Sequence, residues 1–244
     1  MKIFIVNSAI QSEAKNFLKK YGRMITVQPN KNLPKPEQCH ADMQFAKICQ
    51  NTLVAAPEVS EETLNLLISC GIHVIKGITE LSSAYPQNIP YNILNCGKHF
   101  FHNTKHTDPA VVTALSHKNA ILHNVRQGYA GCSSIAVSCS QNKTLVLSSD
   151  PGIISAIQSL QEPTLTAEFF EATNEILLEG YDHGFIGGCC GFDQELGLLL
   201  YGKINGQLAM LSEKYNFTIT SIYDGPITDV GGILVMYPNL QDQD

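Results

Sequence analysis

Residues 39–76 read CHADMQFAKICQNTLVAAPEVSEETLNLLISCGIHVIK, and this segment is the clearest copy of a unit that repeats along the chain. Its apolar runs and turn residues predict a strand, a tight turn, a second strand, a helix and a third strand. Pro57 and Ser60, each followed by glutamate, signal the start of the helix, and Gly71 separates it from the last strand. The predicted elements fall in order at 41–49, 50–51, 52–56, 57–67 and 72–76.

The same order of elements recurs three more times along the chain, which indicates an internal repeat. The TLVLSSDP segment at 144–151 occupies the same slot as TLVAAPE at 52–58. One copy has strands at 131–139 and 144–149 joined by a turn at 140–143, a helix that begins at Asp150-Pro151, and a third strand at 175–180. A second copy has strands at 91–95 and 100–103, a helix from Asp108-Pro109 over 110–117, and a third strand at 120–125. The last copy has strands at 185–191 and 197–202, a helix over 207–215, and a third strand at 217–223.

The two ends of the chain supply a fifth unit when they are joined. The C-terminal part gives a strand at 229–236, and the N-terminal part gives a strand at 2–7, a helix over 12–21 and a strand at 24–28. A unit split across both termini is what a closed circular array produces. We therefore predict one α/β domain over residues 1–244, a five-fold pseudo-symmetric β/α propeller. The alternative is an ordinary α/β layer fold, because strands that alternate with helices are common.

Composition excludes several classes of function. The 244 residues carry 16 Lys and Arg against 22 Asp and Glu, a net charge of −6, and the basic residues are scattered. This argues against nucleic acid and against an anionic membrane as partners. The eight cysteines lack paired spacing, and no apolar run has the length of a signal-peptide core or a membrane span, so we expect a cytoplasmic protein.

Titratable residues open the predicted inner strand of four of the five units. In a ring the first strand of each unit lies nearest the axis, so these positions can converge on one cavity. A thiolate is a nucleophile that a neighbouring histidine activates and assists as acid and base, and carboxylates are suited to binding a planar guanidinium cation. The positions are His40 and Asp42, the stretch around Asn92, Cys132, Asp182 with His183, and Asp229.

Two segments carry a resemblance to a known family. The segment HADMQFA at 40–46 resembles the H-x-D strand of agmatine deiminases and their relatives in the guanidino-group-modifying superfamily, whose fold, the pentein fold, is a five-fold β/α propeller. The segment GYAGCS at 128–133 resembles the glycine-rich segment that carries the nucleophilic cysteine of that superfamily. The order of units is circularly shifted relative to those enzymes. The glutamate that some members carry two residues before the histidine is replaced by Gln38, with Glu37 one position off.

The resemblance implies a cofactor-free and metal-free enzyme of guanidine or amidine chemistry, either a deiminase-like hydrolase or an amidinotransferase, that acts on a small cationic substrate. It implies Cys132 as the nucleophile, His40 as the general acid and base, and Asp42 as a carboxylate that contacts the substrate. The second carboxylate stays open among Asp182, Asp193 and Asp229.

Several alternatives remain on the sequence alone. Cys189 or Cys190 could be the functional thiol, and Asp229 could be a turn residue that caps its own backbone. A Cys-x2-His-x2-His spacing at Cys96, His99 and His102, with His106, His117 and His123 downstream, could bind a metal. A non-catalytic binding protein, similar to the ribosome anti-association factor that shares the propeller, is the alternative from another functional class.

Overall fold

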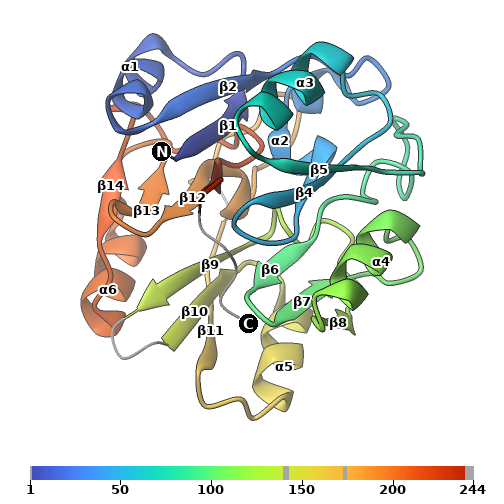
Figure 1. The fold of residues 1–244 in the computed structure, drawn as a ribbon. Helices are drawn as coiled ribbons and strands as arrows, with labels where there is room; N and C mark the ends of the chain where they lie inside the picture. Colours follow the sequence, from blue (N-terminus) through green and yellow to red (C-terminus); the bar gives the residue numbers. More distant parts are fainter. Residues whose placement is uncertain (1, 140–142, 173–174, 240–244) are drawn as a thin grey trace.

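The computed structural model describes residues 2–139, 143–172 and 175–239. These residues form five three-stranded sheets, each with one helix on its outer side (Figure 1). In every sheet the inner strand pairs antiparallel with the middle strand, and the middle strand pairs parallel with the outer strand. The five units thus have one topology. We number them modules one to five along the chain, and the unit made from both termini comes last. They are β3 (Phe45–Lys47), β4 (Thr52–Ala55), α3 (Glu61–Ser69) and β5 (His73–Lys76); β6 (Leu94–Cys96), β7 (His99–His102), α4 (Pro109–His117) and β8 (Ile121–Asn124); β9 (Ser134–Cys139), β10 (Lys143–Ser148), α5 (Pro151–Ser159) and β11 (Leu165–Phe169); β12 (Cys190–Asp193), β13 (Gly197–Leu200), α6 (Gly206–Tyr215) and β14 (Ile219–Ser221); and β15 (Leu234–Met236), β1 (Ile3–Asn7), α1 (Ser12–Tyr21) and β2 (Arg23–Val27).

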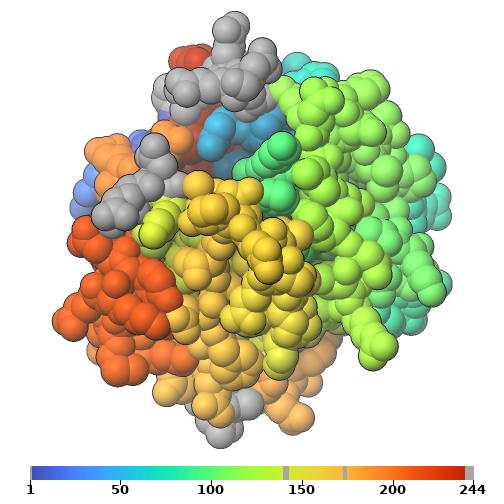
Figure 2. Space-filling view, turned by 90° about the horizontal axis from the view of Figure 1, so that it is seen from below, coloured from blue at the N-terminus to red at the C-terminus, as the bar shows by residue number. Residues whose placement is uncertain are grey.

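The fifth module is built from both ends of the chain, as predicted. Strand β15 near the C-terminus pairs with β1 near the N-terminus, so Ile3 lies opposite Met236. This pairing closes the ring and confirms the five-fold propeller. Around the ring, β6 packs beside β9, β9 beside β12, and β12 beside β15. The view from below shows module three, in yellow, between module two in green and module four in orange-red (Figure 2).

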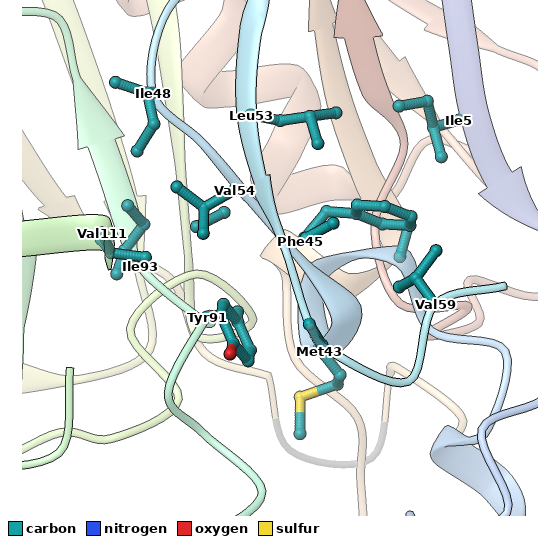
Figure 3. Packing of buried hydrophobic residues seen from close by; sticks show 14 of the residues in the cluster. Ile5, Met43, Phe45, Ile48, Leu53, Val54, Val59, Tyr91, Ile93 and Val111 are labelled. Carbon is teal, nitrogen blue, oxygen red and sulfur yellow. The ribbon is translucent and has the colours of Figure 1, made fainter. Parts of the chain in front are cut away.

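The helices begin where capping residues predict that they should. The carboxylates of Asp108 and Asp150 accept backbone N–H bonds at the starts of α4 and α5, and a proline follows each of them. Ser60 and Asn205 cap α3 and α6 in the same way. The main core then forms where modules meet: Ile5, Phe45, Leu53, Val54 and Val111 come from three modules and pack in one cluster (Figure 3).

Three local predictions are wrong. The strand expected at 185–191 begins only at Cys190, because Gly187–Cys189 form a 3₁₀ turn before β12. The third strand of module three is β11, not 175–180, because α5 ends at Ser159 and Gln161 adopts a positive φ of 52° that turns the chain straight back into a strand. Within 175–180, Leu177 makes only an isolated bridge to Thr228. The segment expected to open the first strand of module one is instead a helical turn, α2 (Ala41–Gln44). The predicted turn at 140–143 falls mostly on residues 140–142, which lie outside the described residues.

No helix in the described ranges is both long and apolar enough to cross a lipid bilayer.

Candidate active site

The segments that enter the inner strands meet at one end of the ring. Each lies just before a strand near the axis, which is where residues from different modules approach one another. They carry His40 and Asp42 before β3, Asn92 before β6, Cys132 before β9, Asp182 and His183 before the turn η3 (Gly187–Cys189) that leads into β12, and Asp229 before β15.

The Cys132 side chain is buried and held by two other modules. Its thiol donates to Oδ2 of Asp42 at 3.0 Å. The amide of Asn92 brackets the same residue: Nδ2 donates to Sγ at 2.8 Å, and Oδ1 accepts the backbone N–H of Cys132 at 2.9 Å. Nδ2 of Asn92 also lies 3.1 Å from the carbonyl oxygen of Asp42. Asn92 therefore fixes the thiol relative to the carboxylate.

His40 is buried beside a second carboxylate, that of Asp229. Nδ1 of His40 lies 3.9 Å from Oδ1 of Asp229. The oxygens of Asp229 are held in turn by the backbone N–H groups of Phe185 and Gly231, at 2.9 and 3.0 Å. Asp229 does cap a turn, as the alternative suggested, and the same turn directs its carboxylate toward His40. Gly231 has φ of +79°, and a Cβ there would collide with His40, so only glycine suits this position.

A cavity of about 280 Å³ opens onto these groups. His40, Met43 and Cys132 line it, together with the aromatic rings of Tyr129, Tyr181 and Phe185. The rings of Tyr129 and Phe185 are stacked with centroids 6.2 Å apart. The cavity has the size of a small-molecule site in which apolar walls surround a few polar groups.

Glu37 also lines the cavity. From the sequence it is notable only because it lies one position away from the glutamate that some members of the resembled family carry. It ends the short 3₁₀ turn η1 (Lys35–Glu37), and its side chain is buried at 6% exposure. The hydroxyl of Tyr181 donates to its Oε1, while Oε2 has no hydrogen-bond partner among the described residues. Oδ1 of Asp42 is likewise buried without a partner. Two carboxylates near the thiol thus each keep an oxygen free to accept a hydrogen bond.

Burial sets the electrostatics of the site. It raises the pKa of Asp42 from 3.8 to about 6, with opposing contributions from His40, which lowers it, and Asp229, which raises it. Burial, followed by the negative charges of Asp42 and Asp229, also raises the pKa of Cys132 well above its ordinary value. From the sequence we expect a neighbouring histidine to activate the thiol. In the free protein burial and the carboxylates instead raise the pKa of Cys132, which favours the protonated thiol.

The other residues singled out by sequence fall in different places. Asp182 and His183 line the cavity, and Asp182 is exposed at its mouth. Asp193 does not line it: its carboxylate accepts from Lys2 at 2.9 Å and from the hydroxyl of Tyr237 at 2.8 Å. Cys189 and Cys190 are buried away from the lining, and Cys189 donates to the carbonyl of Ile186.

The histidine-rich hairpin of module two does not assemble a metal centre. Over the described ranges, no three His, Cys, Asp or Glu side chains are arranged to hold an ion. His99 and His123 pair through their rings at 2.9 Å, and both ring nitrogens of His102 are occupied by Thr107 and the carbonyl of Gly128. All eight cysteines are free of disulfides.

A family model described as "Family of unknown function (DUF6873)" matches residues 5–234. The chain belongs to this family. A comparison of this DUF6873 protein with curated proteins finds no match.

Solved structures with a similar fold are enzymes of the pentein superfamily. SxtG, an amidinotransferase from Microseira wollei in the saxitoxin biosynthetic pathway, gives a TM-score of 0.56 at 10% identity over 94% of this chain and 89% of that one. DDAH from Pseudomonas aeruginosa, as a mutant complexed with citrulline, gives 0.51 at 8% identity over 96% and 98%. ArgZ, a cyanobacterial arginine dihydrolase of the ornithine-ammonia cycle, gives 0.53 at 10% identity over 99% of this chain and 40% of that one. At these identities the likeness establishes the pentein fold for this DUF6873 chain.

Proposed function

We propose that this protein binds a small guanidinium or amidinium compound and attacks its central carbon with Cys132, which leads to hydrolysis of a C–N bond or to transfer of the amidino group. One observation carries the proposal. The thiol of Cys132, the imidazole of His40 and the buried carboxylate of Glu37 line one small cavity, and the buried carboxylate of Asp42 accepts a hydrogen bond from that thiol; each carboxylate has an oxygen without a partner among the described residues. A planar cation with several N–H donors is the ligand that satisfies such acceptors.

In this proposal the carboxylates of Asp42 and Glu37 bind the guanidinium cation. Oδ1 of Asp42 and Oε2 of Glu37 are two of the buried acceptor oxygens that have no partner among the described residues, so each would accept an N–H bond from the substrate. Charge-assisted bonds of this kind are about twice as strong as neutral ones. Glu37 thereby takes the place of the second carboxylate that sequence reasoning sought among Asp182, Asp193 and Asp229. We assign Asp229 a positioning role, because its carboxylate lies beside the imidazole of His40.

The chemical steps follow from these positions. The thiol of Cys132 gives its proton to His40, and Sγ bonds to the guanidinium carbon. A C–N bond then breaks, and the departing amine or ammonia takes the proton from His40, which leaves an amidino group on sulfur. A water molecule gives a proton to His40 and bonds to the same carbon, the C–S bond breaks, and the departing Sγ takes that proton from His40, which restores the thiol and the neutral imidazole. In the transfer variant an acceptor amine replaces that water.

The raised pKa of Cys132 is consistent with this sequence of events. Asp42 and Asp229 raise the thiol pKa by their negative charge, after burial itself. A bound cation offsets those charges and stabilises the thiolate, since opposite charges nearby favour the charged form. The nucleophile is thus generated when substrate is present, and the free protein keeps a protonated thiol.

The decisive experiment compares wild type with Cys132→Ala on a panel of guanidines and amidines, with release of ammonia or amine and formation of the ureido or transferred product as readouts. We expect the variant to lose turnover by at least 10³-fold, a loss typical for removal of a covalent nucleophile. Cys189→Ala is the matched control, since that thiol lies outside the cavity, and it should keep activity. Turnover that survives Cys132→Ala would contradict the assignment.

A non-catalytic binding protein is the second candidate, and the protonated thiol favours it. Alkylation of Cys132 measured against pH, with and without a saturating guanidine, separates the two. A catalytic thiol should show a lower apparent pKa when an unreactive guanidine analogue is bound. A profile that does not move on binding favours the binding protein.

A further inference from the structure

One loop of module four reaches along the cavity to the segment that precedes module one. It covers residues 177–185, just before the turn η3, and Tyr181 is one of its residues that line the cavity. A Cβ built at Gly180 would lie 3.8 Å from Cγ of Pro36, so the tip of the loop lies beside η1. The loop therefore joins two parts of the cavity wall that are 144 residues apart in the sequence.

The base of this loop is held against Asp229. The backbone N–H of Asp229 donates to the carbonyl of Leu177 at 2.8 Å, and the backbone N–H of Phe185 donates to Oδ2 of Asp229 at 2.9 Å. The backbone N–H of Gly184 donates to the carbonyl of Ile176 at 2.9 Å, which closes the loop on itself. Because these bonds lie at the base, a change confined to the tip leaves Asp229 in place.

The tip is tied to Glu37 by a side-chain hydrogen bond. The hydroxyl of Tyr181 donates to Oε1 of Glu37, while Oε2 is buried and has no partner among the described residues. The last side-chain torsion of a glutamate is broad, so a bond to one oxygen also decides where the other oxygen points. Burial, followed by the hydrogen bond to Glu37 and its charge, raises the pKa of Tyr181, so the hydroxyl stays a donor at neutral pH.

We propose that Tyr181 is a positioning residue of the guanidinium site: its hydroxyl orients the carboxylate of Glu37 so that Oε2 can accept an N–H bond from the substrate. This inference rests on the proposed function, because that function assigns Glu37 to the cation. Tyr181 acts through Glu37 and not on the reacting carbon. Loss of the hydroxyl should therefore weaken binding of ground state and transition state alike, which raises KM and leaves kcat nearly unchanged.

The kinetic test is Tyr181→Phe, which keeps the aromatic ring in the cavity wall and removes only the hydroxyl. We expect KM for the best guanidine substrate of the wild type to rise about tenfold and kcat to stay within about threefold, since the lost bond is one to a charged group. Tyr223→Phe is the matched control, because Tyr223 stacks on Tyr201 and does not line this cavity. It should change neither constant. A fall in kcat at unchanged KM would overturn the inference, because it would place Tyr181 in the chemical steps.

A binding experiment shows whether Tyr181 acts through Glu37. Calorimetry with arginine, agmatine, methylguanidine and benzamidine compares four proteins: Cys132→Ala alone, with Tyr181→Phe, with Glu37→Leu, and with both. Glu37→Leu keeps most of the side-chain volume and accepts no hydrogen bond. We expect Tyr181→Phe to raise Kd about tenfold when Glu37 is present and less than about twofold when it is replaced, since residues that act as a pair are not additive. An equal effect in both backgrounds would overturn the inference and leave the proposed function standing. Absence of binding for every probe, together with absence of turnover by the wild type, would overturn both.

Discussion

Replacing Asp42 with asparagine should stabilise the protein at neutral and alkaline pH, and it should remove the proposed carboxylate contact with the substrate. Asp42 is buried, one of its carboxylate oxygens has no partner among the described residues, and its pKa is raised from 3.8 to about 6. Burial is the largest cause. The raised pKa means that the folded protein holds this carboxylate in its charged form only at a cost.

The magnitude follows from linkage between protonation and folding. Below about pH 4 the carboxyl group is protonated in both folded and unfolded chains, and its contribution to stability is complete. Between about pH 4 and 6 the folded protein keeps the proton that the unfolded chain releases, so stability falls as pH rises through the folded pKa. A shift of about two units amounts to about 3 kcal/mol lost at pH 8. An asparagine of the same shape does not ionise and avoids this loss.

The assay is urea-induced unfolding of wild type and Asp42→Asn at pH 4, 6 and 8. We expect the free energies of unfolding to agree within about 1 kcal/mol at pH 4 and the variant to gain about 2 to 3 kcal/mol at pH 8. Asp224→Asn is the control for loss of an exposed carboxylate and should show no such dependence. A variant that is less stable at pH 8, or a difference that does not change with pH, would refute the reasoning.

Two further outcomes can be measured. Asp42→Asn removes a charge 3.0 Å from Sγ of Cys132, an interaction of about 5 kcal/mol at an effective dielectric of about 20. Loss of even a quarter of this energy would lower the pKa of the Cys132 thiol by about one unit. Iodoacetamide labelling of Cys132 at pH 8, followed by mass spectrometry, should therefore become at least tenfold faster, and an unchanged rate would contradict the contact. Gly188→Ala places a methyl group onto the carboxylate of Asp229, so we expect a loss of 1 to 3 kcal/mol in urea unfolding and at least a tenfold fall in turnover. Gly206→Ala, with open space around it in the first turn of α6, should instead gain about 0.5 to 1 kcal/mol, and equal effects at both glycines would argue against the steric explanation.

The fold could be predicted because its signals are local and repeated. Asp108-Pro109 and Asp150-Pro151 combine a capping side chain with a residue whose φ suits the first helical turn, and both helices begin there. The split fifth module is a consequence of repetition and needs no long-range information. The predicted strand at 175–180 is wrong because its signal is ambiguous. That segment is as apolar as a strand, and only the turn at Gln161 shows that the third strand of module three has already formed as β11.

The site could be predicted only in part, because its contacts run between modules. His40, Asp42 and Cys132 were identified from residue type and position, and the structure brings them together. Asn92 was noted only as a module start. Its function as a bracket for the thiol depends on the distance between two loops 40 residues apart. A helical turn at α2, where sequence favoured a strand, likewise decides which way the Asp42 side chain points.

The electrostatic cost of the site is itself an argument for a cationic ligand. Burying a carboxylate without a counter-charge destabilises the folded chain, and here Glu37, Asp42 and Asp229 are buried within one region. A structural carboxylate in the same protein looks different: Asp193 pairs with Lys2, accepts from Tyr237, and has a lowered pKa. Asp42 has the opposite shift because burial raises its pKa, and the groups that offset this, His40 and the thiol of Cys132, include no lysine or arginine. A guanidinium in the cavity would give this carboxylate the pairing that Lys2 gives Asp193. The contrast between the two aspartates therefore supports our proposal that Asp42 binds a cationic ligand, whereas Asp193 serves folding.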